Sequence, residues 1–408
     1  MPSTQPRILV VFGTRPEVIK LAPVIQALQG AAGPGSGAAE GGSAGPRTPR
    51  AQTPGWSVSM CNTGQHRELV PPLLETFGLT PEVELGVMNP GQSLSMLTAR
   101  LLDGLDPVLD ALRFDWVVVQ GDTTTAMVAA LAAYHRRVPV AHVEAGLRTY
   151  DLAAPFPEEG NRQLIARLAS LHLAPTLRSR EALLAEGVAA DKIVVTGNTV
   201  VDAVRWMSER LPEDGSPPAG APSELIRFTG HRPVVLITGH RRESFGGGLA
   251  AVCEGLAELA KAYPGTDFVY PVHLNPSVQA AVRGPLGNFN NVHLLEPVDY
   301  PAAIWLLKRC LFVITDSGGL QEEAPEFGKP VLVTRMSTER GEGIAAGCAQ
   351  LVGYDRELLV ASARRLLDEP ARVKIKNPYG DGKAGLRCAA ALRERLGLGG
   401  APVEPWQP

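Results

Sequence analysis

The chain has 408 residues, of which 45% are hydrophobic and 20% are charged, and its formal net charge is −3. This length exceeds what a single core usually serves, so we expect two domains in a soluble globular protein. The small negative charge gives no basis for a nucleic-acid partner, and we expect neither a membrane span nor a signal peptide. The five cysteines are odd in number, widely spaced and never in a CxxC pair. This usage is typical of a reducing cytosol and disfavours zinc, so we expect a cytoplasmic protein.

Short β-branched runs alternate with longer helical patterns along the chain, which predicts parallel sheets in an α/β fold. In the first half the expected strands are residues 8–14, 57–64, 115–123, 138–146, 171–176 and 193–198. The same rhythm restarts in the second half, with expected strands at 233–240, 267–273, 291–297, 311–319 and 330–335. Two doubly wound domains in tandem are the simplest account of this pattern.

Two stretches interrupt the pattern. Residues 211–222 are rich in proline, glycine and acidic side chains, which is typical of a surface connection. Residues 30–55 consist mostly of glycine, alanine, proline and serine. We expect this second stretch to be a disordered surface insertion between the first helix and the second strand, with a functional lid as the alternative.

Polar side chains follow the expected strands, at the sheet edge where parallel α/β folds gather their ligands. After the first strand, Gly13 suits a tight turn and Pro16 suits the first turn of a helix. Arg15 and Lys20 can then both point towards an anionic ligand. The alternative is that they belong to an ordinary solvated helix face.

Three acidic residues suggest proton-transfer chemistry. Asp122 and Glu144 each come just after an apolar strand, and Glu158 opens a helix that also carries Arg162. Several carboxylates near one site are what proton abstraction from a weakly acidic C–H bond requires. The plainer alternatives are a helix cap for Asp122, a structural salt bridge for Glu144 and a helix-dipole partner for Glu158.

The second half carries residues suited to an anionic nucleotide. Residues 237–248 hold a histidine, two arginines and a glycine run, while Ser317, Gly318 and Gly319 begin a helix. Free amides at such a helix start can hold a diphosphate, and Glu323, about one turn on, can accept ribose hydroxyls. There is no GxGxxG fingerprint with its ribose-binding acid and no GxxxxGK[ST] loop, which disfavours dinucleotide and ATP-hydrolysing sites.

With these segments in place, the chain resembles the non-hydrolysing UDP-N-acetylglucosamine 2-epimerases of bacteria. The motifs that carry the resemblance, in the order of that family, are FGTRPE, TGQHRE (63–68), GDTTT, HVEAGLRT, PEEGNR, TGNTVVDA (196–203), TGHRRES, YPVHLNP (270–276), TDSGGLQEEAP, TER (338–340) and NPYGDGKA (377–384). They extend from about residue 8 to about residue 396, interrupted mainly by residues 30–55.

The resemblance implies a GT-B-like fold with two Rossmann-like domains and the active site in the interdomain cleft. It places the first domain at residues 1–197, completed by a C-terminal helix at 378–396, and a UDP-binding domain at 198–377. The implied reaction is reversible epimerisation at C2 of UDP-N-acetylglucosamine to UDP-N-acetylmannosamine, for cell-surface polysaccharide precursors. It proceeds by anti elimination of UDP to 2-acetamidoglucal and re-addition, without NAD or metal. A homodimer is implied as well.

The resemblance also assigns roles to individual residues, leaving open which carboxylate is the base and which the acid. The implied catalytic residues are Asp122, Glu144, Glu158 and His240. The implied substrate ligands, beyond Asp122, Glu144 and His240, are Arg15, Lys20, Arg162, Val298, Ala303, Ser317, Gly318, Gly319, Glu323 and Arg340. A second UDP-N-acetylglucosamine is implied as an allosteric activator, with a site lined by Gln65, His66, Gln92, Arg241 and His273.

The sequence departs from the family pattern at two places. Gly341 and Gly343 stand where the family commonly reads TERPEA, so we expect a more flexible loop after Arg340. Val298 and Ala303 are small and apolar in the segment expected to cradle uracil, which puts side-chain contacts to the base in doubt. The alternative functions are a hydrolysing epimerase, a GT-B glycosyltransferase and a non-catalytic nucleotide-sugar sensor.

Overall fold

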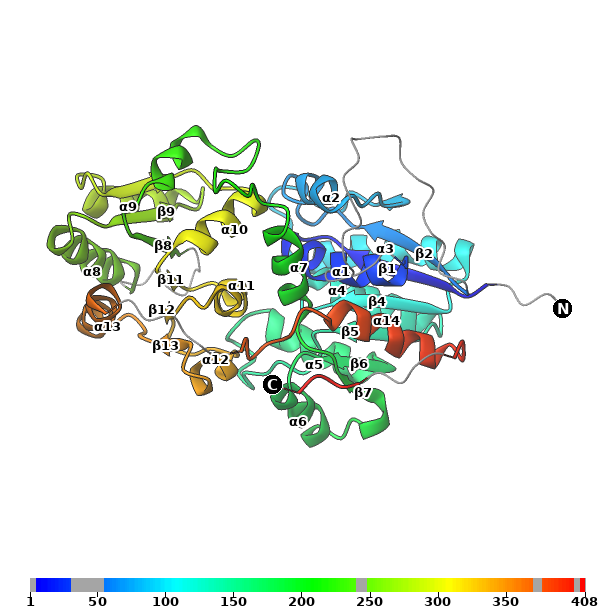
Figure 1. The fold of residues 1–408 in the computed structure, drawn as a ribbon. Helices are drawn as coiled ribbons and strands as arrows, with labels where there is room; N and C mark the ends of the chain where they lie inside the picture. The colour runs from blue at the N-terminus through cyan, green and yellow to red at the C-terminus, as the bar shows by residue number, and fades with distance from the viewer. Residues whose placement is uncertain (1–4, 31–54, 240–247, 370–375, 400–403, 408) are drawn as a thin grey trace. The chain divides into compact units, whose positions relative to one another are not determined.

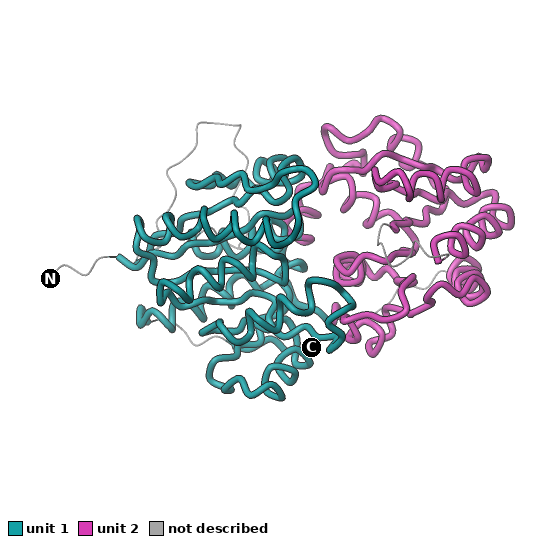
Figure 2. Tube along the Cα trace, turned by 180° about the vertical axis from the view of Figure 1, so that it is seen from behind, with its two compact units in different colours: residues 1–203, 379–408 teal, residues 204–378 magenta. Residues whose placement is uncertain are grey.

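The protein is described by a computed structural model that covers residues 5–30, 55–239, 248–369, 376–399 and 404–407. The chain forms two compact units, and Figure 2 colours them separately. Unit 1 comprises residues 1–203 and 379–408, and unit 2 comprises residues 204–378. The first crossing between the units lies inside helix α7 (Thr199–Ser208), whereas the sequence-based domain bounds put it just ahead of that helix.

Unit 1 is built on a parallel sheet of seven strands in the order β3-β2-β1-β4-β5-β6-β7 (Figure 1). Its strands are β1 (Arg7–Phe12), β2 (Ser57–Asn62), β3 (Val83–Glu84), β4 (Trp116–Gln120), β5 (Val140–Val143), β6 (Leu171–Ala174) and β7 (Ile193–Val195). Because β1 pairs with β2 on one side and β4 on the other, the strand order reverses there. Ligand sites of open α/β sheets lie at such a reversal, outside the carboxyl ends of the strands.

Helices cover both faces of this sheet (Figure 1). They are α1 (Arg15–Leu28), α2 (Pro71–Phe77), α3 (Leu94–Leu112), α4 (Thr124–His135), α5 (Glu158–Leu168), α6 (Leu177–Ala185) and α14 (Ala384–Arg395). The C-terminal helix α14 packs against α1, and the pair approaches closely at Gly385. A Cβ at this position would lie 2.6 Å from the Pro23 carbonyl oxygen, so only glycine fits. The C-terminal segment therefore completes unit 1.

Unit 2 repeats the architecture with a parallel sheet of six strands in the order β10-β9-β8-β11-β12-β13. Its strands are β8 (Val234–Thr238), β9 (Asp267–Pro271), β10 (Val292–Leu295), β11 (Phe312–Thr315), β12 (Val331–Val333) and β13 (Ala349–Leu351). Its helices are α8 (Gly248–Ala262), α9 (Pro276–Leu286), α10 (Tyr300–Arg309), α11 (Gly318–Glu323), α12 (Gly341–Ala345) and α13 (Arg356–Asp368). The order reverses between β8 and β11, so this unit has its own switch point.

The predicted class, two Rossmann-like parallel α/β sheets, is confirmed. Every strand predicted from the sequence is present in shorter form, whereas β3 and β13 were missed because two or three residues show no periodicity. Residues 31–54, most of the predicted insertion, lie outside the described residues. Among the residues that are described, no helix has the length and apolar character needed to cross a membrane.

Candidate active site

Glu144 is held in a buried network at the end of β5. Its backbone has φ of 64°, a left-handed conformation that is rare outside glycine, and the residue is 8% exposed. Lys20 of α1 forms an ion pair with it, and the side-chain amide of Gln120 on β4 donates to its other oxygen. The amide of Asn198, just after β7, donates to Oε1 at 3.0 Å. An ionised carboxylate can accept all of these bonds, so the surroundings suit a negative charge here.

Asp122 is held by a second cation. It follows β4, and its Oδ2 lies 2.7 Å from Nη2 of Arg162, a buried residue of α5. The Nη1 atom of Arg162 lies 3.4 Å from Glu159, and the side chain of Asn161 donates to the Asp122 carbonyl at 2.9 Å. The Asp122 side chain keeps 26% of its surface exposed, so it stays accessible to a substrate. The N-cap of helix α4 is Thr123, so Asp122 does not have the helix-capping role that was the alternative to a catalytic one.

The two carboxylates lie at neighbouring strand ends. Strands β4 and β5 are paired, and the amide of Gly121 donates to the Val143 carbonyl at 3.0 Å. Gly121 has φ of 69°, and a Cβ built on it would lie 3.6 Å from Oε2 of Glu144. Asp122, the next residue, therefore projects from the backbone that passes beside the Glu144 carboxylate. This edge brings together the two acidic residues that the sequence singled out.

The third predicted acid, Glu158, is half-buried at the start of α5. Its neighbour Glu159 is fully buried and accepts from the amides of Thr149 and Tyr150 at 3.0 and 3.1 Å. Burial acts to raise the pKa of Glu159, but these hydrogen bonds and Arg162 hold it below its ordinary value. Glu159 thus fixes the start of α5, from which Glu158 and Arg162 both project.

Glu17 is a buried carboxyl that the sequence reasoning missed. It is 0% exposed, and burial raises its pKa to about 7, against hydrogen bonds that lower it. One oxygen accepts from the amides of Gly13 and Thr14 at 3.0 and 2.8 Å, and the other accepts from the Thr123 hydroxyl at 2.6 Å. Glu17 therefore connects the start of α1, which carries Arg15, to the loop after Asp122. The capping-box spacing from Thr14 to Glu17 was the signal available in the sequence.

His142 on β5 is a second buried polar residue at this edge. Its Nε2 donates to the Gly121 carbonyl at 2.7 Å, and burial lowers the pKa of the ring to about 3. The ring is therefore neutral near pH 7 and cannot act as a cation there. Its contact instead fixes the turn that precedes Asp122.

The four predicted allosteric residues that the structure describes, Gln65, His66, Gln92 and His273, each make a hydrogen bond within their own unit. Gln65 accepts from the Thr125 hydroxyl at 2.7 Å, and Nδ1 of His66 accepts from the Arg15 amide at 3.3 Å. Burial, and then Arg15, lower the pKa of His66. Gln92 accepts from Arg100 at 2.7 Å, and in unit 2 Nδ1 of His273 accepts from the Asn275 amide at 3.1 Å. His66 thus lies next to Arg15 and Gln65 next to Thr125, while Gln92 lies against α3.

In unit 2 the predicted nucleotide ligands gather after β11. Gly318 lies directly under Arg340, because a Cβ at this position would lie 2.5 Å from the guanidinium carbon. The Arg340 guanidinium is 2.9 Å from Glu322 and is also paired with Glu339. A Cβ on Gly319 would lie 3.9 Å from Oε1 of Glu323, so that carboxylate folds back over the helix start. The predicted nucleotide ligands Ser317, Gly318, Gly319, Glu323 and Arg340 therefore form one group.

The remaining predictions for unit 2 concern the proposed uracil segment, the loop after Arg340, and His240 and Arg241. Val298 and Ala303 flank the start of α10, on the carboxyl side of β10, and both are half-buried. The expected flexible loop after Arg340 is instead helix α12, which begins at Gly341, with the Gly343 carbonyl accepting from the Cys348 amide at 3.0 Å. His240 and Arg241 lie outside the described residues.

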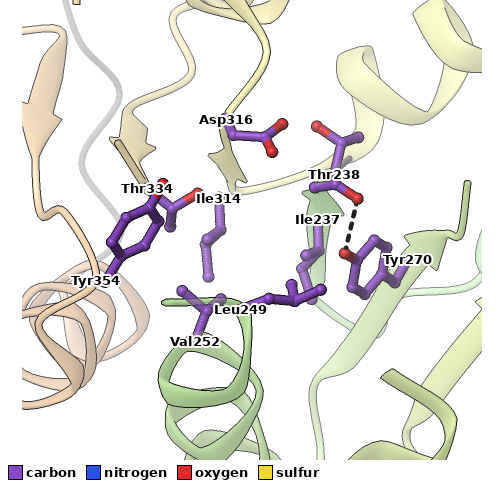
Figure 3. Close-up of a pocket in the computed structure, with 10 residues that line it drawn as sticks. Ile237, Thr238, Leu249, Val252, Tyr270, Ile314, Asp316, Thr334 and Tyr354 are labelled. Atoms are coloured by element: carbon purple, nitrogen blue, oxygen red, sulfur yellow. Dashed lines mark hydrogen bonds between the residues drawn. The ribbon is translucent and has the colours of Figure 1, made fainter. Parts of the chain in front are cut away.

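A small cavity lies beside this group, lined by side chains from β8, β9, β11 and α8 (Figure 3). Its volume is about 10 Å³, which is close to the space that one water molecule needs. Tyr270 closes one side by donating to the Gly239 carbonyl at 3.1 Å. The cavity is too small for a nucleotide, so it belongs to the packing beneath the strand ends.

Comparison with known proteins places the chain in one family. The model of the UDP-N-acetylglucosamine 2-epimerase family matches residues 50–393. The chain is 46% identical to a probable UDP-N-acetylglucosamine 2-epimerase of Ralstonia nicotianae, over 95% of this chain and 98% of the relative. It is 44% identical to the UDP-N-acetylglucosamine 2-epimerase of Salmonella typhimurium, with the same coverage.

A solved structure agrees with this placement. The UDP-GlcNAc 2-epimerase of Neisseria meningitidis, crystallised with UDP-GlcNAc, is 39% identical to the chain and superposes with a TM-score of 0.83. The alignment covers 95% of this chain and all of that one. The family model, the relatives and the solved structure agree, so the chain belongs to the UDP-N-acetylglucosamine 2-epimerase family.

Proposed function

We propose that the protein interconverts UDP-N-acetylglucosamine and UDP-N-acetylmannosamine by eliminating UDP and adding it back after inversion at C2. The proposal is supported most directly by Asp122 and Glu144, which lie at adjacent strand ends and are each held by a buried cation. Inversion through an elimination needs a base on one face of C2 and an acid on the other. Two separately held carboxylates meet that need.

The proposed proton transfers involve three residues of unit 1. A carboxylate removes the C2 proton as the C1–O bond to UDP breaks, which gives 2-acetamidoglucal. Re-addition of UDP then requires a proton at C2 from the opposite face. Asp122, Glu144 and Glu158 are the candidates, and Arg162 and Lys20 orient the first two through their ion pairs.

We assign the nucleotide to unit 2. Arg340 lies over Gly318 at the carboxyl end of β11, where its cation can offset the charge that grows on departing UDP. Glu323, folded over the same helix start, is the acceptor proposed for the ribose hydroxyls. Ser317 and Gly319 supply backbone near the diphosphate, and Val298 and Ala303 lie at the proposed uracil end. His240 and Arg15 are the further cations that we assign to the diphosphate.

Several finer features belong to the same proposal. Elimination and re-addition of one leaving group is redox-neutral, so the reaction as written needs no NAD, and the charge on UDP is met by side chains rather than a metal. A second UDP-N-acetylglucosamine is proposed as an activator near Gln65 and His66, which contact Arg15 and Thr125. The family resemblance is the basis for proposing a homodimer in the cytoplasm.

Product analysis tests the proposed function. EDTA-treated protein is incubated with UDP-N-acetylglucosamine without added NAD, and the sugar products are identified by NMR. The proposal predicts a mixture of the two UDP-sugars at equilibrium. Free N-acetylmannosamine with UDP as the main product would assign a hydrolysing enzyme instead. An unchanged substrate, with UDP binding intact, would leave a transferase or a sensor.

A further inference from the structure

Asn198 is hydrogen-bonded to both of the segments by which the chain passes between the two units. The first crossing lies in α7, and Oδ1 of Asn198 accepts from the Val200 amide in the first turn of that helix at 3.0 Å. The second crossing ends at Tyr379, the first residue of the returning segment, whose carbonyl accepts from the Asn198 amide at 2.7 Å. One residue thus fixes the unit 1 ends of both connections.

The other polar group of the Asn198 side chain holds Glu144. Its Nδ2 donates to Oε1 of this carboxylate at 3.0 Å, and Asn198 is 2% exposed. The other two donors described for Glu144, Lys20 and Gln120, come from α1 and β4, within the body of the unit 1 sheet. Among these three, Asn198 is the donor that lies at the chain crossings.

The backbone around Asn198 is closely packed. A Cβ on Gly380, in the returning segment, would lie 3.3 Å from the Asn198 carbonyl oxygen and 3.4 Å from its nitrogen. Gly197, the residue before Asn198, has φ of 84°, and a Cβ there would lie 3.5 Å from Cα of Gly380. The backbones of the two segments are therefore in direct contact, so a shift of the returning segment must move Asn198.

We propose that Asn198 is a positioning residue that couples both chain crossings to the orientation of the Glu144 carboxylate. A displacement of either crossing is then transmitted to a group that, in the proposed function, transfers a proton at C2. The inference rests on that function, since the coupling matters only if Glu144 takes part in the reaction. Asn198 itself acts through Glu144.

Two substitutions at Asn198 separate its donor from its cap on α7. Asn198→Asp keeps the shape and the acceptor for Val200 but replaces the donor to Glu144 by an oxygen. Asn198→Ala removes both. We expect each to lower kcat by roughly 10- to 100-fold, the usual effect of losing one hydrogen bond to a charged group, with KM changed less than about 3-fold. The limb of the kcat–pH profile that reports Glu144 should move to higher pH whether Glu144 is the base or the acid, because Glu144 loses a donor that favours its charged form.

Gly380→Ala perturbs Asn198 without touching Glu144. The added methyl group should push on the Asn198 backbone, lower kcat by several-fold and move the same limb of the pH profile. Combined with Asn198→Ala, it should lower kcat by less than the product of the two single effects, since both act through one contact. The matched control is Asn291→Ala in unit 2, where a buried asparagine donates to three carbonyls, those of Ala260, Tyr263 and Thr266. This variant should have a lower Tm and the same kcat–pH profile as the wild type.

The outcomes are distinct. A kcat–pH profile in which the limb that reports Glu144 moves to higher pH in Asn198→Asp and Gly380→Ala, and stays unshifted in Asn291→Ala, supports the coupling. Wild-type kcat and pH profile in the first two, with only a lower Tm, would overturn it and leave Asn198 a structural residue. A wild-type protein that produces no UDP-N-acetylmannosamine would overturn the proposed function and this inference with it.

Discussion

Lys20 and Glu144 form an ion pair in which both side chains are buried, with 8% and 6% of their surface exposed. The pair joins α1, the helix that follows β1, to the end of β5, which lies two strands from β1 in the sheet. Burying two charges is costly, and such a pair often stabilises a fold no better than apolar residues of the same volume would. Its presence at the strand ends therefore fits a role in the site better than a role in stability.

Removing the cation of this pair should be strongly destabilising. In Lys20→Met the carboxylate of Glu144 stays buried without its charged partner, and we expect a loss of about 3–5 kcal/mol in the free energy of unfolding. Urea unfolding measures it. Arg136→Met is the control, because its ion pair with Asp106 is exposed and should leave the midpoint nearly unchanged. Equal losses in both variants would contradict the account of a buried, uncompensated charge.

The two carboxylates should be needed for turnover and not for nucleotide binding. Asp122→Asn and Glu144→Gln keep the side-chain shape but remove the proton-transferring group, so kcat should fall by about 10²–10⁴-fold. UDP affinity, measured by calorimetry, should stay within a few-fold, because we assign the nucleotide to unit 2. Asp267→Asn offers a comparison in unit 2, where the buried carboxylate pairs with Arg232 and His293 away from the proposed site. Near-normal kcat in the first two variants would remove them from the mechanism.

Adjacent glycines of the SGG motif should respond differently to alanine. Gly318→Ala would put a methyl group 2.5 Å from the Arg340 guanidinium carbon, so Arg340 must move and both Tm and UDP affinity should fall. Gly319→Ala meets no atom closer than 3.8 Å. It should keep the Tm or raise it slightly, because glycine costs conformational entropy in a helix. The comparison needs thermal melts and UDP titrations of both variants, and a Gly319→Ala melt as low as that of Gly318→Ala would argue against the Arg340 contact.

The raised pKa of Glu17 predicts a pH-dependent stability difference. Between its ordinary value of 4.5 and its value of about 7 in the folded protein, the folded state binds more protons than the unfolded state. The contribution of Glu17 is therefore fully present below pH 4.5 and is lost as the pH rises to about 7. Glu17→Gln removes this dependence, so its free energy of unfolding relative to wild type should rise by about 3 kcal/mol from pH 4 to pH 8.

Chemical denaturation of both proteins at several pH values measures that difference. The conservative variant retains an acceptor for the Gly13 and Thr14 amides, which keeps the start of α1 intact. A stability difference that stays constant across this range would show that Glu17 titrates normally. It would also remove the argument that burial dominates its environment.

The sequence was sufficient for the sheets and for the charged residues at their edges. Asp122 and Glu144 each follow a run of buried strand residues, and hydrophobic patterning locates such runs directly. The parallel arrangement then places their ends along one edge. The short strands β3 and β13 carry too few residues for any periodicity, and the expected flexible loop at Gly341 became a helix because local glycine content does not report tertiary packing.

The partners of the charged residues were harder to predict. Asn198 is far from Glu144 in the sequence, and its amide reaches the carboxylate only because β7 joins the same sheet. Gln120 is the last residue of β4, where a polar side chain after an apolar run is ordinary. Glu17 follows a helix start, where an acidic residue is ordinary, and its link to Thr123 depends on two loops meeting in space. Long-range hydrogen bonds of this kind leave no periodic signal.

The most direct test of the proposed mechanism follows the C2 hydrogen. The protein is incubated with UDP-N-acetylglucosamine in deuterium oxide, and NMR follows the C2 proton of substrate and product. Proton abstraction by a side chain that exchanges with solvent predicts UDP-N-acetylmannosamine carrying deuterium at C2, with Asp122→Asn and Glu144→Gln both slowing its formation. UDP-N-acetylmannosamine that forms with its C2 proton fully retained would contradict the mechanism, because the hydrogen would then never have left for an exchangeable group.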